Sequence, residues 1–352
     1  MALRFFLGAN SGEGFVTLYP QLLREESRYF ISVKGGPGCG KATCIRTLAQ
    51  GLGDVREWIP CSSDPHSLDG ALTPSAVLLD GTPPHVQEPL FPGTGEEYLA
   101  LPGPLDPAGL AEQRPALLAL RAASQDHYAR AYALLAAAVR VRAARRSRVE
   151  KAFPAALLAR RGTGLLRREV PKAKGPGLLR QRFLEGMTPL GPLTLHEELP
   201  AVFPRIIALE DPFGLGAPLL ELLRDGALAR GQEVYACLDP LEPQRLRHVL
   251  LPGAGLAFVT RDSVFPALPQ PTRRIHLDRM LPREALSAEG PRLRLLEKTL
   301  SSLLSQASQE IAAAHALHDR MEAIYRPHLP AQALDDLCRE TLARLSPSLG
   351  SR

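Results

Sequence analysis

Cysteine, lysine and aromatic residues are scarce in this chain of 352 residues, and long apolar runs are missing. Its five cysteines form neither a Cys-x-x-Cys pair nor a cluster with histidine, which argues against a disulfide scaffold and a structural zinc site. No apolar run reaches the ~18 residues of a membrane helix, and the opening residues become polar too early for a signal peptide. We therefore expect a cytoplasmic protein without a membrane partner.

The net charge of +5 is unevenly distributed along the chain. Residues 140–182 hold 14 Lys or Arg against only Glu150 and Glu169, so this segment carries +12 and the rest of the chain −7. A solvated helix end with a basic linker is one interpretation, and a surface for nucleic acid is the other. Because only Phe153 and Phe183 could stack on bases there, a nucleic-acid partner is possible but not favoured.

Four segments of the first half recur in the same order in the second half, at offsets of about 175–181 residues. Such an ordered run of matches predicts two tandem copies of one α/β unit, at 1–160 and 182–352, joined by a basic linker at 161–181. The matched pairs are Phe5–Ser11 with Arg182–Thr188, Tyr29–Val33 with Arg205–Leu209, Cys61–Pro65 with Cys237–Pro240, and Ala76–Leu79 with Leu256–Val259.

Strand and helix signals alternate within each copy. In the first copy, the apolar runs Tyr29–Val33, Val55–Cys61 and Ala76–Leu79 predict buried strands, and Lys41–Leu52 has the apolar spacing of a helix. This alternation favours a mainly parallel sheet with flanking helices.

A long amphipathic helix follows each set of strands. Apolar or small residues recur every three or four positions from Leu293 to Tyr325, and the same spacing runs from Tyr128 to Arg142, after a start or kink at Pro115. We expect these two helices to pack against each other, so that the halves form an intramolecular pseudo-dimer.

The segment Gly35–Thr43 fits the pattern G-x-x-x-x-G-K between a predicted strand and a predicted helix. Glycines let successive backbone N–H groups surround a phosphate, and the helix N-terminus favours the same anion. Lys41, one of six lysines, would reach the β- and γ-phosphates. The predicted nucleotide-binding residues are Gly35, Gly36, Pro37, Gly38, Cys39, Gly40, Lys41, Ala42 and Thr43.

The residue after the motif lysine departs from the pattern. A Ser or Thr hydroxyl would hold Mg²⁺ there, but this chain has Ala42, and Thr43 lies about 100° further round the helix. Asp80 ends the apolar run Ala76–Leu79 and is the predicted Mg²⁺ ligand. The sequence therefore supports nucleotide binding better than hydrolysis, with a weakened Mg²⁺ site.

Three further polar residues are expected near this edge of the sheet. Asp64 and Asp69 could position a water or bind a cation, or could only form turns, because Asp-Pro and Asp-Gly are common turn formers. His85 could contact phosphate or orient a water, or could be merely structural. Lys41, Asp80, His85 and Asp64 are the predicted catalytic residues.

The second copy has lost these groups. Its loop is Asp211–Pro218, with Ala217 where Lys41 stands, and Glu210 and Asp211 would repel a phosphate. We predict that this half does not bind nucleotide as the first half does.

Together these residues resemble a family of bacterial P-loop proteins, described as ATPases or ATP-binding proteins, that have two tandem P-loop-like halves. The resemblance implies two P-loop NTPase-like units, the second degenerate, with ATP or GTP as cofactor. Family members carry Ser or Thr where this chain has Ala42. The matching segments are Phe5–Phe15, Gly35–Thr43, Cys61–Gly70 and Asp80–His85.

Three functions stay open at this point. The first is an ATPase that uses the first-half loop. The second is a nucleotide-gated scaffold or sensor without useful turnover, which Ala42 favours. The third is a small-molecule kinase, in which the Asp64/Asp69 segment or His85 would face an acceptor hydroxyl.

Overall fold

The computed structural model describes residues 2–25, 29–84 and 86–349, which form two compact units. We call residues 1–8, 17–131 and 309–352 the first unit, and residues 9–16 and 132–308 the second unit. Each unit therefore combines segments from both halves of the sequence. These ranges differ from the predicted segments 1–160 and 182–352, because each unit takes its outer helix from the far half.

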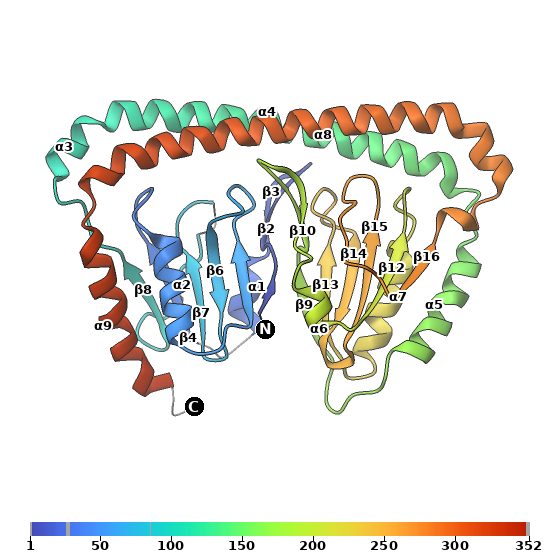
Figure 1. The fold of residues 1–352 in the computed structure, drawn as a ribbon, viewed down its shortest axis with the longest axis horizontal. Helices are drawn as coiled ribbons and strands as arrows, with labels where there is room; N and C mark the ends of the chain where they lie inside the picture. The colour runs from blue at the N-terminus through green and yellow to red at the C-terminus, as the bar shows by residue number, and fades with distance from the viewer. Residues whose placement is uncertain (1, 26–28, 85, 350–352) are drawn as a thin grey trace. The chain divides into compact units, whose positions relative to one another are not determined.

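The first unit contains a mixed six-stranded sheet in the order β1-β5-β6-β7-β4-β8 (Figure 1). Only β6 runs antiparallel to its neighbours, and the other pairs are parallel. Strand β4, which precedes the glycine-rich segment, therefore lies between two parallel strands. The strands are β1 (Leu3–Arg4), β4 (Tyr29–Lys34), β5 (Glu57–Pro60), β6 (Leu68–Leu72), β7 (Ala76–Asp80) and β8 (Glu96–Ala100).

Helix α2 (Lys41–Gly51) covers this sheet through Cys44, Ile45, Leu48 and Ala49, all buried. Helix α9 (Ala331–Leu349) packs on α2 and adds Cys338 and Leu345 to the same core. Each fully buried leucine here contributes roughly 1.5–3 kcal/mol to folding. The remaining elements of this unit are α1 (Tyr19–Glu25), α3 (Pro107–Glu112) and the 3-10 turn η3 (Arg326–His328).

The second unit repeats this design with the sheet order β16-β12-β15-β14-β13-β9, in which only β14 is antiparallel to its neighbours. It also holds two β-hairpins. The strands are β2 (Gly8–Ser11), β3 (Gly14–Thr17), β9 (Leu178–Arg182), β10 (Glu185–Thr188), β11 (Gly191–Thr194), β12 (Arg205–Glu210), β13 (Glu233–Leu238), β14 (Leu246–Leu251), β15 (Leu256–Arg261) and β16 (Arg273–His276). The helices are α5 (Ala155–Glu169), α6 (Leu199–Val202) and α7 (Ala217–Leu228), with 3-10 turns η1 (Pro252–Ala254) and η2 (Asp278–Met280).

The outer helices are exchanged between the two halves of the sequence. Helix α5 follows the strands of the first half but packs on α7 of the second unit, where Gly162 lies against Leu219 and Gly226 against Leu166. Helix α9 follows the strands of the second half but packs on α2 of the first unit. The sequence alone does not reveal this exchange, because both helices continue the long helices that precede them.

The two long helices contribute to both units. Helix α4 (Arg114–Glu150) passes from the first unit to the second after residue 131, and α8 (Arg283–Tyr325) passes back after residue 308. In the first unit the two helices meet at Ser124, whose hydroxyl donates to the Ala314 carbonyl at 3.4 Å.

The α/β class with flanking helices is confirmed, and the predicted strands and first helix agree with β4, β5, β7 and α2 to within two residues. Each six-stranded sheet is mainly parallel, as predicted, and contains one strand, β6 or β14, that is antiparallel to both of its neighbours. Strand β6 lies in a segment that had been interpreted as a loop. The predicted linker 161–181 holds most of α5 and the start of β9. Among the described residues, no helix has the length and apolar character needed to span a membrane.

Candidate functional site

The glycine-rich segment forms a tight bend between β4 and α2. Gly38 and Gly40 have φ angles of 65° and 87°, in the left-handed region that side chains disfavour. Gly40 is the N-cap of α2 and supplies no side-chain cap to its first turn. The bend therefore brings backbone amides and the positive end of a helix dipole to one place.

Lys41, the first residue of α2, folds back over this bend. Its Nζ donates to the Gly36 carbonyl at 3.1 Å and to the Gly35 carbonyl at 3.5 Å, and lies 3.8 Å from Asp80 Oδ2. Both the Lys41 and Asp80 side chains are mostly buried. The ammonium group therefore lies inside the bend, beside the carbonyls of Gly35 and Gly36.

Asp80 reaches the site because β4 and β7 are parallel neighbours, with Val33 opposite Asp80. Their carboxyl ends therefore share one edge of the sheet, where ligands of open α/β sheets bind. The second oxygen of Asp80, Oδ1, accepts hydrogen bonds from the Thr82 N–H at 2.8 Å and the Thr82 hydroxyl at 2.6 Å. Only Oδ2 faces Lys41.

Residues from the end of α8 and the start of α9 lie directly on the bend. A Cβ atom added to Gly36 would lie 2.6 Å from the Tyr325 ring, and one added to Gly40 would lie 2.5 Å from the Leu334 side chain. At Gly38, the nearest atom would be Glu322 Cβ at 3.2 Å. All these residues belong to the first unit.

Glu322 places a carboxylate on the loop itself. Its carboxylate lies 3.3 Å from His318 Nε2, and its Cβ lies 3.2 Å from the place where a Cβ on Gly38 would stand. His318 is the main cause of the lowered pKa of Glu322, and the Gly38 amide and nearby Lys41 lower it further against the effect of burial. The periodicity of residues 293–325 predicts only a packing stripe and gives no signal of this contact.

The other predicted residues have different surroundings. Thr43 is exposed on α2, and Ala42 is partly buried beside Lys41. Asp64 Oδ1 accepts from the His66 N–H at 3.2 Å, and the Asp64 carbonyl accepts from the Ser67 N–H at 2.9 Å, which is turn geometry. His85 lies outside the described residues.

Asp69 lies on β6, buried, and accepts a hydrogen bond from the Tyr19 hydroxyl at 3.0 Å. Burial and, next, the Asp69 charge raise the pKa of Tyr19 well above its ordinary value. Tyr128 on α4 lies close enough for its hydroxyl to bond Ser63, and burial raises its pKa to about 12. The Tyr19 hydroxyl and the buried Asp69 carboxylate thus lie together at the start of β6, where Asp69 is 4% exposed.

The corresponding loop of the second unit is closed by its own carboxylate. Asp211 Oδ1 accepts from the Leu215 N–H at 2.8 Å, and Oδ2 accepts from the Gly216 N–H at 2.7 Å. Asp211 is buried, and Ala217 begins α7 as Lys41 begins α2. An internal anion therefore sits at the helix start where the first unit has a lysine.

A buried charge cluster in the second unit was not foreseen from the sequence. Arg142 Nη1 lies 2.7 Å from Asp239 Oδ2 and its Nη2 3.2 Å from Asp262 Oδ2, and Arg247 Nη1 lies 2.9 Å from the same Asp262 oxygen. Arg247 also pairs with Glu185. Arg142 had been interpreted as part of an apolar stripe, since spacing alone cannot distinguish a buried ion pair from a hydrophobic contact.

Much of the basic segment is engaged with carboxylates of the second unit. Arg145 pairs with Glu297 at 2.6 Å and Arg146 with Glu242 at 2.9 Å. A nucleic acid would have to displace these partners before it could use the same guanidinium groups.

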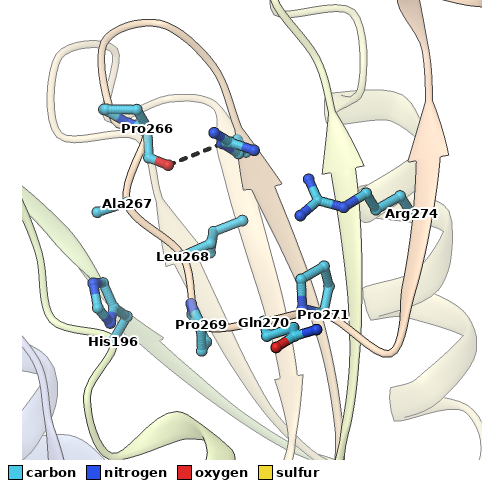
Figure 2. Close-up of a pocket in the computed structure, with 9 residues that line it drawn as sticks. His196, Pro266, Ala267, Leu268, Pro269, Gln270, Pro271 and Arg274 are labelled. Atoms are coloured by element: carbon cyan, nitrogen blue, oxygen red, sulfur yellow. Dashed lines mark hydrogen bonds between the residues drawn. The ribbon is translucent and has the colours of Figure 1, made fainter.

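The second unit also holds a cavity of about 430 Å³ under the proline-rich loop that follows β15 (Figure 2). Arg261 Nε donates to the Pro266 carbonyl at 2.9 Å and helps to fix this loop. Glu210 pairs with Arg274 at 2.5 Å and with Arg261 at 3.6 Å, so both cations of the cavity already face a carboxylate. The lining residues are His196, Arg261, Pro266, Ala267, Leu268, Pro269, Gln270, Pro271 and Arg274.

No protein-family model matches the chain, and neither a curated protein nor a solved structure matches it. Backbone amides, a helix start and an ammonium group are the groups with which proteins bind anions, and here they lie beside the Asp80 carboxylate.

Proposed function

We propose that the chain is a nucleotide-binding protein whose loop Gly35–Thr43 holds the phosphates of ATP or GTP. The observation that carries this proposal is Lys41, which turns back over a left-handed glycine bend at the start of α2 and faces Asp80 at 3.8 Å. The resemblance to tandem P-loop ATPases supports the same assignment.

Each group has a role in this proposal. The backbone N–H groups of Gly36, Gly38 and Gly40 would donate hydrogen bonds to phosphate oxygens, with the helix dipole of α2 behind them. On nucleotide binding, the Lys41 ammonium would release the Gly35 and Gly36 carbonyls and donate to a phosphate oxygen instead. This new bond joins two charged groups and is therefore stronger.

Mg²⁺ fits this site only in part. Asp80 Oδ2 is available to a cation held jointly with phosphate oxygens, the usual way in which proteins bind Mg²⁺ with nucleotides. Its Oδ1 is engaged by Thr82, and Ala42 supplies no hydroxyl. These two observations favour a nucleotide-responsive binding protein over a rapid ATPase. A kinase acting on a small molecule is the enzymatic alternative.

The decisive test is calorimetric titration with ATP and GTP, with and without Mg²⁺. The substitution Lys41→Ala should abolish nucleotide binding, while the same change at Lys298, an exposed residue of α8, should leave it unchanged. Undiminished affinity in Lys41→Ala would end the assignment.

The same preparation distinguishes the functional alternatives. Phosphate release that appears only after Ala42→Ser would support the binding role, because it would show that the missing hydroxyl limits turnover. Nucleotide consumption that begins only when a metabolite is added would support the kinase.

A further inference from the structure

We infer that the residues 318–334, which we call the C-terminal elbow, are an internal stopper of the nucleotide loop, and that the Glu322 carboxylate holds the place of a nucleotide phosphate. This inference rests on the proposed function, because it explains how access to that same site is regulated. Nucleotide binding would then require the elbow to leave the loop.

The first argument is chemical. A carboxylate and a phosphate offer the same kind of negatively charged oxygen acceptor to backbone amides. The Glu322 side chain lies against Gly38, with its Cβ 3.2 Å from the place where a Gly38 Cβ would stand, and both the Gly38 amide and Lys41 lower the pKa of its carboxyl. Gly38 is one of the two left-handed glycines that shape the bend, so its amide is among the groups that a phosphate would need.

The second argument is steric. Tyr325 lies so close to Gly36, and Leu334 so close to Gly40, that not even a methyl group fits between them without a shift. The elbow therefore covers three glycines of the loop, Gly36, Gly38 and Gly40. A triphosphate of several times that volume cannot enter this face while the elbow is in place.

The third argument comes from the second unit. There the anion at the helix start is Asp211, which belongs to the loop and is held by amides four and five residues further along the chain. Such a carboxylate is a permanent part of its loop. In the first unit the carboxylate comes from a different helix, 284 positions further along the chain from Gly38, and can therefore move away without unfolding the loop.

The elbow also contains a histidine, His318, that would stay beside Glu322 after the elbow has left the loop. His318 lies one helical turn before Glu322, and its Nε2 is 3.3 Å from the Glu322 carboxylate. The released glutamate would keep this partner, which lowers the cost of giving up the Gly38 amide. The apparent affinity for nucleotide then depends on the fraction of molecules in which the elbow has left the loop, because only these molecules can bind.

The experiment compares ATP binding by calorimetry in the full chain, in Glu322→Ala and in the control Glu340→Ala, an exposed position of α9. Removal of the competing carboxylate should tighten ATP binding by at least about fivefold, the lower range of measured coupling between sites. Glu340→Ala should not change it. Equal affinity in all three proteins would overturn the stopper while leaving the proposed function intact.

Hydrogen exchange followed by mass spectrometry supplies a second readout. On addition of ATP to the unaltered chain or to Tyr325→Ala, amides of the loop 35–43 should exchange more slowly and those of the elbow 318–334 more quickly. Slower exchange in both segments would overturn the inference, since the elbow would then be part of the binding site. Failure of every variant to bind ATP or GTP would remove the proposed function and the stopper together.

Discussion

Replacement of Asp211 by alanine should destabilise the second unit by about 2–6 kcal/mol, because two buried amides each lose their acceptor. The substitution leaves the N–H groups of Leu215 and Gly216 without their acceptors, and both residues are buried directly before α7. A buried amide without a partner costs about 1–3 kcal/mol. Asp211→Asn keeps one acceptor oxygen and should cost only about half as much.

The pH dependence gives an independent check on the same residue. Burial is the largest effect on Asp211 and raises its pKa above the ordinary value, although the two amides oppose it. Between the ordinary carboxyl pKa of about 4 and the raised folded value, the folded protein binds more protons than the unfolded chain. The free energy of unfolding of the natural protein should therefore fall as pH rises through that interval. The difference in free energy of unfolding between the natural protein and Asp211→Asn should become smaller over the same interval.

Urea unfolding followed by circular dichroism between pH 4 and 7 measures both effects. Glu221→Ala, at an exposed position of the same helix, is the matched control and should stay within about 0.5 kcal/mol of the natural protein. If Asp211→Ala is no less stable than Glu221→Ala, the carboxylate is not the anion that closes this loop.

Two further predictions concern buried ionisable groups. Arg142→Ala should cost about 3–5 kcal/mol in urea unfolding, because it leaves the buried Asp239 and Asp262 carboxylates short of a counter-charge; exposed Arg140→Ala should have little effect, and similar losses from both would contradict the cluster. Because the pKa of Tyr128 is raised to about 12, its contribution to stability should be lost as pH rises from about 10 to 12. The pKa of Tyr128 can be measured as the difference between absorbance titrations of the natural protein and of Tyr128→Phe. If the tyrosine that the substitution removes ionises near pH 10, the prediction is wrong.

The sequence predicts the local elements around the loop because they depend on neighbours in the chain. Glycines before Lys41, apolar runs in β4 and β7 and the helical spacing of α2 are all local signals. The antiparallel strand β6 was missed because Asp69 and Gly70 interrupt an otherwise short apolar run. The repeat also reveals the second copy, including its missing lysine at Ala217.

Long-range contacts were beyond the reach of the sequence. Nothing in the spacing of Glu322 or Tyr325 links them to glycines almost 300 positions earlier, and a single sequence carries no record of such pairs. Arg142 fits an apolar stripe as well as a leucine would, because a buried arginine with two carboxylates satisfies the same periodicity. Tertiary structure therefore decides both features.

The exchange of outer helices has a consequence for biosynthesis. Cys44 packs against Cys338, whose sulfur lies 3.5 Å away across 294 positions of sequence. The sheet of the first unit is therefore translated before α9, and one flank of its core stays uncovered until residues 331–349 have been synthesised. A fragment ending near residue 160 would keep that flank exposed permanently, so we expect it to aggregate or to recruit chaperones.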